Sequence, residues 1–516
     1  MGNKTPESSV DITSFVSGTA IVFVGTVLSN LSGFIERVFL GNSLSVESFG
    51  NVGIALSIWA IGLSASQLGV PLGVARYIPR YQEEEQKRGV YQTGIILTFL
   101  GSSIISLSVI IGSPVAKLWI PEFGKSIYVL QLLAVALIPI SLMNTSVQAM
   151  RGMENSIYRV AVNDILYPLT RIGLIVLLIL IGLENTSVGY AYIFAGCAAA
   201  FVSVYLLSNL IGLRGPSTLV PKELIGYSIP LMLSSIVLIL ITKVDTIMVG
   251  GILGAQQAGL YSAAYPVANG LIIALSASGY LYLPLVSRLD ANDTKETERI
   301  EQIYALTAKW ILIFTFPPFA VFVFFPSDII GIFFGSGYSQ ASTPLVILSI
   351  GFFLNAVLGR CQETLSALDF TRFVFIANLS AFILNIILNL LLIPTLGIVG
   401  ASAASSAAFI SMNLLAIATL YYVSGIVPIN RYNIKTGIIL FALLFPCVWI
   451  STSLINLTYI SLLPYLIVLG LTSIILVGVG GGFQNEDMEV INLLEEKIGI
   501  QLWMLRIFIN GDNNES

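Results

Sequence analysis

Apolar runs of about 20 residues recur from one end of this chain to the other, and a helix of that length spans the hydrocarbon core of a bilayer. Of 516 residues, 56% are hydrophobic, 24 are Lys or Arg and 28 are Asp or Glu. That is too little charge to cover a water-soluble protein of this size. We therefore expect an all-α, polytopic membrane protein with about fourteen transmembrane helices. The predicted spans are 13–36, 48–72, 90–113, 125–147, 157–182, 187–212, 222–250, 259–285, 303–326, 340–366, 372–397, 400–424, 433–455 and 460–480.

Positive residues gather in the loops on one side of the predicted membrane. Taking the loops alternately from the N-terminus, this side carries Lys4, Arg76, Arg80, Lys87, Arg88, Arg151, Arg159, Arg214, Lys222, Arg288, Lys295, Arg299, Arg372, Arg431, Lys435, Lys497 and Arg506. The other side carries Arg37, Lys117 and Lys125. Since cytoplasmic loops are enriched in Lys and Arg, we expect a multi-pass cell-membrane protein with both termini in the cytoplasm. No cleavable signal pattern precedes the first span, which is expected to act as its own insertion signal.

Histidine is absent from the chain, and its three cysteines, Cys197, Cys361 and Cys447, stand singly within predicted helices. These counts exclude a His/Cys zinc site, a Ser/His or Cys/His nucleophile and a disulfide framework. No G-x-x-x-x-G-K-[ST] phosphate loop is present, so ATP hydrolysis has no visible site. We expect no catalytic residues, no metal site and no enzyme activity. Any coupling to protons must then use carboxylates.

An internal repeat aligns the first predicted span with the seventh. Sliding the chain by 209 residues places ERVFLGNSLSVESFG, which starts at Glu36, over DTIMVGGILGAQQAG, which starts at Asp245. Gly50 then aligns with Gly259. The repeat predicts a unit of six helices that has been duplicated, with two further helices appended.

The duplication divides the chain into four parts. Residues 1–220 form an N-terminal lobe of six spans and residues 221–425 a C-terminal lobe of six spans; residues 426–482 hold two additional spans, and residues 483–516 form a cytoplasmic tail. Apolar residues recur at helical spacing in this tail, as is typical of an amphipathic helix on a membrane surface. Because six is even, both lobes cross the membrane in the same direction, which predicts a cavity between them, as in transporters.

Four charged residues lie at membrane depth in the aligned segments, namely Glu36 and Arg37 in the first span and Lys243 and Asp245 in the seventh. An ionised group there costs several kcal/mol unless it faces protein or water. Lys243 and Asp245 stand two residues apart, roughly 200° around a helix, so they cannot neutralise each other. Each of the four has a structural partner on a neighbouring helix, extends toward a membrane interface, or faces the cavity between the lobes. Their repetition in both halves favours the cavity.

Other spans also contain charges. Arg171 and Asp164, two turns apart in the fifth span, either line the cavity or form a structural pair. Arg360 and Glu363 stand at i and i+3 in the tenth span, which favours an ion pair within one helix, with Arg360 as a further candidate cavity cation. Lys309 lies near the cytoplasmic end of its helix, where its side chain can reach the interface.

One basic segment and one pair of tyrosines each have a structural and a functional interpretation. The basic residues of GVARYIPRYQEEEQKR, including Arg76 and Arg80, either set the topology beside anionic headgroups or form a cytoplasmic entrance for a phosphate-bearing substrate. Tyr261 and Tyr265, one turn apart in the eighth span, could stack a sugar ring or belong to the aromatic belt at the membrane interface.

Several segments together resemble a known family. They are IERVFLGNSLSVESFGNVGIALSI, GVPLGVARYIPRY, QAMRGMENSIYR, DTIMVGGILGAQQAGLYSAAYPV and LLIPTLGIVGASAASSAAF. In order and spacing they are similar to the polysaccharide or oligosaccharide flippases of the multidrug, oligosaccharidyl-lipid and polysaccharide exporter superfamily, over nearly all of residues 10–480. The resemblance implies a V-shaped fold of two lobes, alternating access, and no cofactor. Where that family typically has Arg in the first lobe, this chain has Asn42, which puts more weight on Arg37, Arg171 and Lys243.

The resemblance implies transport of a lipid-linked oligosaccharide from the cytoplasmic to the outer leaflet. A cationic, hydrated cavity would replace the hydration that its phosphate or pyrophosphate loses. We expect Arg37, Arg171, Lys243 and Arg360 to bind this substrate, and Glu36 and Asp245 to couple transport to H⁺ or Na⁺. The partners expected are the lipid-linked oligosaccharide and membrane lipids, with no nucleic acid, and a monomer suffices.

Two alternative functions stay open. One is a drug or organic-cation antiporter of the related multidrug branch, which shares the architecture but would favour an acidic cavity. The other is a membrane glycosyltransferase, which would need acidic residues on sizeable external loops to hold a metal. The longest external stretch, FPSDIIGIFFGSGYSQ, offers only Asp328.

Overall fold

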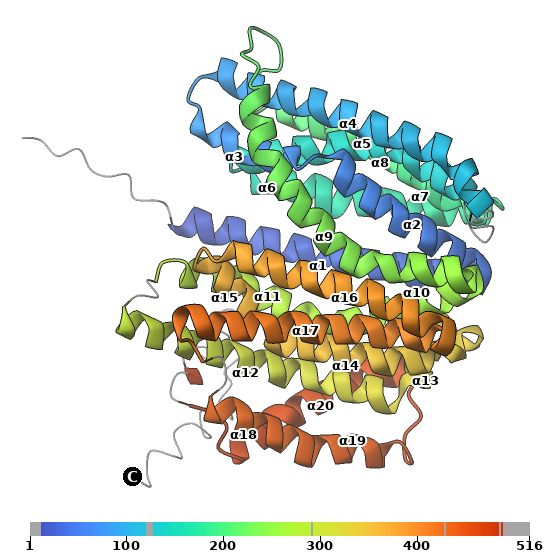
Figure 1. Ribbon diagram of the computed structural model, residues 1–516, viewed down its shortest axis with the longest axis vertical. Coiled ribbons are helices and arrows are strands. Elements are labelled where there is room, and N and C mark those ends of the chain that lie inside the picture. Colours follow the sequence, from blue (N-terminus) through green and yellow to red (C-terminus); the bar gives the residue numbers. More distant parts are fainter. Residues whose placement is uncertain (1–11, 120–126, 290–292, 428–429, 485–486, 489–516) are drawn as a thin grey trace, which may run out of the picture. The chain divides into compact units, whose positions relative to one another are not determined.

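The computed structural model describes residues 12–119, 127–289, 293–427, 430–484 and 487–488, and in these ranges the chain is helical, without a β-strand (Figure 1). The chain forms two compact units, unit 1 ending at Ser262 and unit 2 beginning at Ala263. The helices of unit 1 are α1 (Ile12–Ser43), α2 (Val46–Ser66), α3 (Val70–Tyr77), η1 (Ile78–Arg80), α4 (Glu84–Trp119), α5 (Ile127–Gly152), α6 (Ser156–Val160), η3 (Ala161–Leu166), α7 (Tyr167–Leu180), α8 (Thr186–Ser208), α9 (Pro221–Leu253) and the first half of α10 (Ala255–Asn269).

Unit 2 continues α10 and is also built from helices in its described residues. They are η4 (Gly270–Ile272), α11 (Ile273–Val286), α12 (Thr294–Phe324), α13 (Pro326–Phe334), η5 (Ser336–Ala341), α14 (Ser342–Leu358), α15 (Arg360–Ala367), α16 (Thr371–Leu396), α17 (Ile398–Ser424), α18 (Arg431–Ile439), η6 (Leu440–Leu444), α19 (Phe445–Ser451) and α20 (Tyr459–Val479).

The predicted polytopic membrane fold is confirmed. In the described residues, thirteen helices are long and apolar enough to cross a membrane. They correspond to the second to fourteenth predicted spans, and the first predicted span corresponds to the 32-residue helix α1. Many large apolar side chains on these helices point away from the protein, as Phe201 does at 75% exposure. Outward-facing apolar side chains are expected where the surrounding solvent is lipid.

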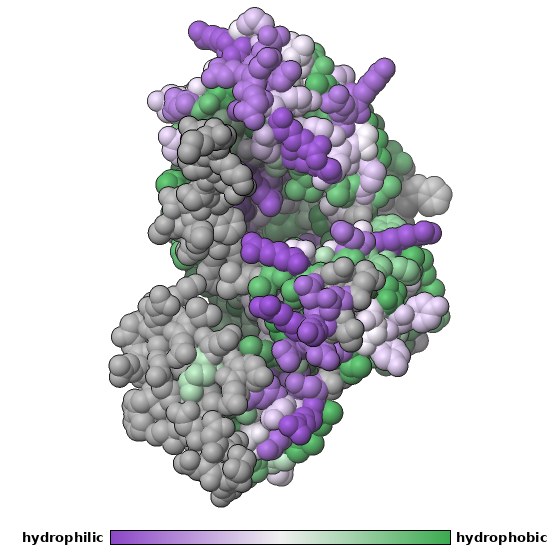
Figure 2. All heavy atoms as spheres, turned by 90° about the vertical axis from the view of Figure 1, so that its left-hand side faces the viewer, coloured by the Kyte–Doolittle hydropathy of each residue, from purple (hydrophilic) through white to green (hydrophobic). Residues whose placement is uncertain are grey.

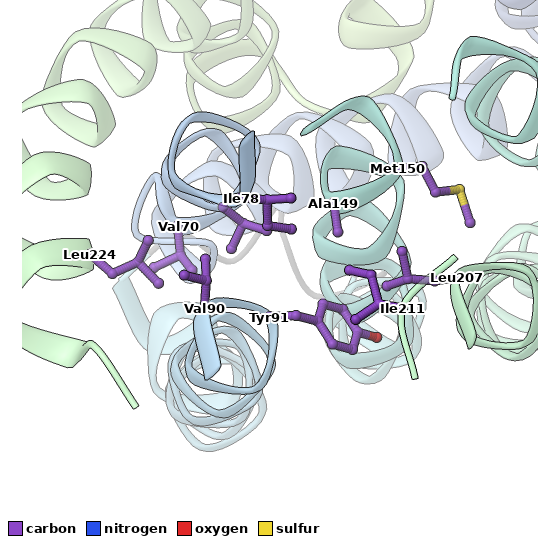
Figure 3. Close-up of a cluster of buried hydrophobic side chains, with 10 residues drawn as sticks. Val70, Ile78, Val90, Tyr91, Ala149, Met150, Leu207, Ile211 and Leu224 are labelled. Carbon is purple, nitrogen blue, oxygen red and sulfur yellow. The ribbon is translucent and has the colours of Figure 1, made fainter. Parts of the chain in front are cut away.

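Within unit 1, a cluster of buried side chains holds α3, η1, α4, α5, α8 and α9 together (Figure 3). It includes Val70, Ile78, Val90, Tyr91, Ala149, Met150, Leu207, Ile211 and Leu224. The Tyr91 hydroxyl bonds Ser146 Oγ at 3.0 Å, so its polar end is satisfied inside the cluster. The cluster fixes the short helix α3 against the first turns of α9.

Arg88 has a structural role at the same end of unit 1. Its side chain is buried, and Nη1 donates a hydrogen bond to the carbonyl oxygen of Pro216 at 2.7 Å, while Nε donates to that of Gly212. These bonds tie the start of α4 to the linker between α8 and α9. Arg88, part of the basic cluster identified in the sequence, therefore supports the backbone.

The two glycines aligned by the repeat meet where α2 and α10 cross. A Cβ at Gly50 would overlap the carbonyl oxygen of Ala255 and lie 2.7 Å from the backbone nitrogen of Gly259. A Cβ at Gly259 would overlap the carbonyl oxygen of Val46. The two backbones approach so closely that a side chain fits at neither position.

Candidate functional site

Glu36 and Arg171 form an ion pair inside unit 1. Glu36 lies in α1 and Arg171 in α7, and Arg171 Nη2 is 2.5 Å from Glu36 Oε2. The Tyr192 hydroxyl, from α8, donates a hydrogen bond to Glu36 Oε1 at 3.0 Å. The side chain of Glu36 is 4% exposed and that of Arg171 is 13% exposed. Removal of either charge would leave the other buried and uncompensated.

Aromatic rings enclose the guanidinium group of Arg171. Its Cζ lies 5.0 Å from the ring centroid of Tyr167 and 4.9 Å from that of Tyr192. Trp59, in α2, packs edge to face against Tyr192 with centroids 5.1 Å apart. Ring faces attract a cation and fix the plane of the guanidinium. The sequence did not single out Tyr192, because 156 residues separate it from Glu36 and no local pattern links them.

Of the two alternatives for Arg171 and Asp164, a structural pair between them is not the one that forms. The carboxylate partner of Arg171 comes from α1, while Asp164 Oδ1 accepts a hydrogen bond from the side-chain amide of Asn163 at 2.7 Å. Asp164 is buried in η3, which is a π-helical segment between α6 and α7. The π-helical turn changes the register of the helix, so spacing counted along an ideal α-helix no longer predicts which side chains meet.

Arg37 and Lys243 are two cations of unit 1 that lie near each other. Arg37 follows Glu36 in α1, Lys243 lies in α9, and both are half-buried. The positive charge of each opposes that of the other. Over the described ranges, neither residue forms an ion pair with Asp or Glu. An anion bound beside them would relieve this repulsion.

Asp245 is fully buried two residues further along α9. Its Oδ2 accepts a hydrogen bond from the hydroxyl of Tyr261, in α10, at 3.1 Å. Tyr261 is itself fully buried, so its ring is not free to stack a sugar or to lie in an interfacial belt. Tyr265 also packs inward, edge to face on Phe352 of unit 2 at 5.2 Å. Both interpretations of these tyrosines are corrected by their burial.

Arg360 and Glu363 form the predicted i, i+3 ion pair in α15 of unit 2. Arg360 is fully buried, and its Nη2 also donates hydrogen bonds to the carbonyl oxygen of Leu275, at 3.2 Å, and to the hydroxyl of Ser278. The ring of Tyr282 lies 4.5 Å from its Cζ. These contacts all hold α15 against α11, so this guanidinium is engaged within unit 2.

The sequence predicted that the Lys309 side chain reaches the membrane interface, and this prediction is wrong. Lys309 is 1% exposed and forms an ion pair with Asp487, in the segment that follows α20. The indole nitrogen of Trp310 donates to Asp487 Oδ1 at 2.9 Å, and the backbone nitrogen of Gln484 donates to Oδ2 at 2.6 Å. Gln484 and Asp487, at the beginning of the predicted tail (483–516), therefore pack into unit 2. The amphipathic helix predicted further along the tail lies outside the described residues.

Arg76 and Arg80 lie at the end of unit 1 where α3 meets the start of α9. Figure 2 shows hydrophilic side chains gathered on the face that includes this end. Both arginines are exposed. The Cζ of Arg76 lies 4.1 Å from the ring centroid of Tyr227, in α9, and that of Arg80 lies 5.5 Å from the ring of Tyr77. The two guanidinium groups are thus held on rings at the surface.

In the part of the chain that the structure describes, no group of three or more His, Cys, Asp and Glu residues could hold a metal ion. The three cysteines are unpaired. Unit 1 instead holds a buried ion pair between Glu36 and Arg171, the cations Arg37 and Lys243, and the buried carboxylate of Asp245.

Comparison with known families gives matches along most of the chain. The family described as "Polysaccharide biosynthesis protein" matches residues 15–290, and the MatE family matches residues 230–391. A Haloferax volcanii protein described as "Probable low-salt glycan biosynthesis flippase Agl15" is 25% identical over 417 residues, which are 81% of this chain and 85% of that protein.

Solved structures of two transporters are similar to this fold. An inward-facing multidrug resistance MATE family transporter of the MOP superfamily matches 77% of this chain and 96% of its own, with 14% identity and a TM-score of 0.65. The lipid II flippase MurJ, in an inward closed conformation, matches 89% of this chain and 98% of its own, with 16% identity and a TM-score of 0.64. At these identities, the similarity is one of fold.

Proposed function

Because this chain belongs to the polysaccharide biosynthesis protein family and has the fold of MOP-superfamily transporters, we propose that it is a flippase for a lipid-linked oligosaccharide. It moves the sugar headgroup, on a polyprenyl phosphate or pyrophosphate, from the cytoplasmic to the outer leaflet by alternating access. The product would serve surface polysaccharide or glycoprotein synthesis. The similarity to a glycan biosynthesis flippase of Haloferax volcanii supports this substrate class.

The observation that carries the proposal is the neighbouring pair Arg37 and Lys243. Two half-buried cations that oppose each other are unfavourable at membrane depth unless water or an anion compensates them. A phosphate or pyrophosphate carries the charge and the acceptor oxygens that both side chains require. The two residues therefore form the proposed phosphate-binding part of the site.

Arg171 and Glu36 supply the proposed coupling to an ion. A phosphate that reaches Arg171 competes with the Glu36 carboxylate for the same guanidinium. Once displaced, that carboxylate can take up H⁺ or Na⁺ and release it when the pair forms again. Asp245, held by Tyr261, is the second coupling candidate, since it is a buried carboxylate on the helix that carries Lys243.

The orientation also belongs to the proposal. The basic residues at the ends of the unit 1 helices where α4 and α9 begin favour placing that end in the cytoplasm, with both termini on the same side of the plasma membrane. Arg76 and Arg80 then lie at the cytoplasmic entrance. A monomer is sufficient for this function.

An organic-cation antiporter is the second candidate, because the multidrug branch has the same fold. Arg37 and Lys243 argue against it, since they would repel a cationic substrate. The choice can be made with the purified protein. A cationic dye that accumulates along an imposed ion gradient, with no headgroup translocation, would favour the antiporter.

The test is headgroup translocation in proteoliposomes that contain a fluorescent lipid-linked oligosaccharide. We expect the double variant Arg37→Gln/Lys243→Gln to lower the rate at least about tenfold, because two charge-assisted contacts to phosphate are lost. Lys222→Gln removes a charge from the exposed start of the same helix and should leave the rate within about twofold of the unmodified protein. Equal rates in all three proteins would overturn the proposal.

A further inference from the structure

Two arginines and two tyrosines form a continuous ladder on the surface of unit 1. Arg80 lies over the ring of Tyr77, with its Cζ 5.5 Å from the centroid. The Tyr77 ring packs edge to face on Tyr227, with centroids 5.9 Å apart, and Arg76 covers Tyr227 at 4.1 Å. The ladder joins α3 and η1 to the first turns of α9. Both guanidinium groups are therefore oriented before any ligand arrives.

Nearby carboxylates do not neutralise the ladder. Glu223 accepts a hydrogen bond from the Tyr81 hydroxyl at 2.9 Å, and Glu84 lies 3.8 Å from Arg88. Among the ion pairs of the described residues, none includes Arg76 or Arg80. Both arginines are exposed.

The ladder lies at the level where lipid headgroups are expected. The apolar spans that flank it begin at Glu84 and at Pro221, so α3 and η1 lie at the ends of membrane-crossing helices. The exposed side chain of Leu72 in α3 is also apolar, as suits a position at the boundary with lipid. A phosphate group at this level meets the arginines without leaving the interface.

We propose that Arg76 and Arg80 form a binding site for the phosphate group of a lipid, preorganised by Tyr227 and Tyr77. A guanidinium stacked on a ring keeps its edge free for two parallel hydrogen bonds to phosphate, which a lysine ammonium cannot make. The inference deepens the proposed function and rests on it, because the site would capture the phosphate of the lipid-linked substrate before it reaches Arg37 and Lys243. The same chemistry would accept an anionic phospholipid headgroup.

Binding can be measured apart from translocation. Full-length protein with Arg37→Gln/Lys243→Gln, which lacks the inner cations, is titrated in detergent with a fluorescent polyprenyl phosphate, and anisotropy gives the Kd. Adding Arg76→Gln/Arg80→Gln should raise the Kd at least about tenfold, because two bidentate contacts are lost. Arg151→Gln/Arg214→Gln removes the same charge from exposed arginines at this end of unit 1 and should change the Kd less than about twofold.

Two further arms test the ladder and the source of the phosphate. Tyr227→Leu removes a ring and should weaken binding about threefold, whereas Tyr227→Phe keeps the ring and should match the parent. Competition with phosphatidylglycerol or inorganic pyrophosphate, but not with the zwitterionic phosphatidylcholine, would assign the site to phosphate groups of net negative charge in general. Competition by unlabelled polyprenyl phosphate alone would assign it to the substrate, and either result supports the site.

The inference is overturned if the variants at 76 and 80 bind like those at 151 and 214, or if phosphatidylcholine competes as well as the anionic lipids. Its failure differs from failure of the proposed function. A protein that binds polyprenyl phosphate through Arg76 and Arg80 but moves no headgroup retains the site and loses the flippase function. A protein that moves headgroups equally well with both arginines replaced retains the function and loses the site.

Discussion

The two units of this protein treat buried positive charge in different ways. In unit 2, Arg360 and Lys309 are almost completely buried, and each is bound by a carboxylate and by a backbone carbonyl group. In unit 1, Arg37 and Lys243 are half-buried and lie near each other, with no carboxylate partner among the described residues. The same residue types thus hold helices together in unit 2, whereas in unit 1 these two form no ion pair among the described residues.

The difference shows that depth in the membrane does not by itself identify a binding residue. A buried cation that finds its counter-ion and hydrogen bonds within the fold has a structural role, and its loss destabilises the protein. Under the proposed function, a cation kept beside a like charge destabilises the empty protein and is retained for the anion that it binds. Removing a buried charge of unit 2 should therefore lower the free energy of unfolding. Removing Lys243 of unit 1 should raise the free energy of unfolding while transport is lost.

The largest effect is expected at the anchor between Lys309 and Asp487. Asp487→Ala leaves a buried ammonium without a counter-ion, and we expect the free energy of unfolding to fall by about 3–5 kcal/mol. Chemical unfolding of the detergent-solubilised protein measures this. Lys309→Met/Asp487→Leu should recover most of the loss, because no charge is left unpaired. If Asp487→Ala costs no more than Asp293→Ala, which removes only the N-cap of α12, the anchor is not structural.

A smaller loss is expected at the buried ion pair of unit 1 between Glu36 and Arg171. Glu36→Gln removes the charge that compensates Arg171 and should lower the free energy of unfolding by about 1.5–3 kcal/mol. Tyr192→Phe removes one hydrogen bond to Glu36 and should cost about 1 kcal/mol. Glu184→Gln, at an exposed turn, should stay within about 0.5 kcal/mol and serves as the control. Equal free energies of unfolding for the three variants would show that the ion pair between Glu36 and Arg171 does not stabilise unit 1.

The opposite sign is expected at Lys243. Lys243→Met removes one of two like charges, so the free energy of unfolding should rise by roughly 0.5–1 kcal/mol even as transport is lost. The same unfolding assay, run beside headgroup translocation, checks both. A fall in stability would mean that Lys243 is a structural residue like Arg360, and the contrast between the units would disappear.

The smallest effect concerns pH at the surface of unit 1. The hydrogen bond to Glu223 raises the pKa of Tyr81 above its usual 10.0, since it favours the protonated phenol in the folded protein. This contribution to stability is complete below pH 10 and is lost as the pH rises above it. Between about pH 9 and pH 11, stability should fall less steeply in Tyr81→Phe than in the parent protein. Equal slopes would show that this bond does not contribute to stability.

Much of the fold was predictable, because the bilayer imposes a length and a composition on every span. Thirteen predicted spans match candidate membrane helices, and the first matches α1. The aligned glycines Gly50 and Gly259 also marked a real feature, the crossing of α2 and α10. Less of the site was predictable. The ion pair in α15 follows from i, i+3 spacing, but Glu36 with Arg171 and Lys309 with Asp487 join helices far apart in sequence.

The sequence by itself determined that this chain is a helical membrane protein, where its helices lie, and which charged residues fall within the predicted spans. These follow from local properties, namely hydropathy, length and the cost of charge in lipid. Only the tertiary structure decided which of those charges are neutralised, since a counter-ion is a matter of distance between helices. The π-helical turn at Ala161–Leu166 shifts the register of its helix, and the buried Asp487 comes from a segment that follows the last span. Both features determine which charges pair, and neither is visible as a pattern in the sequence.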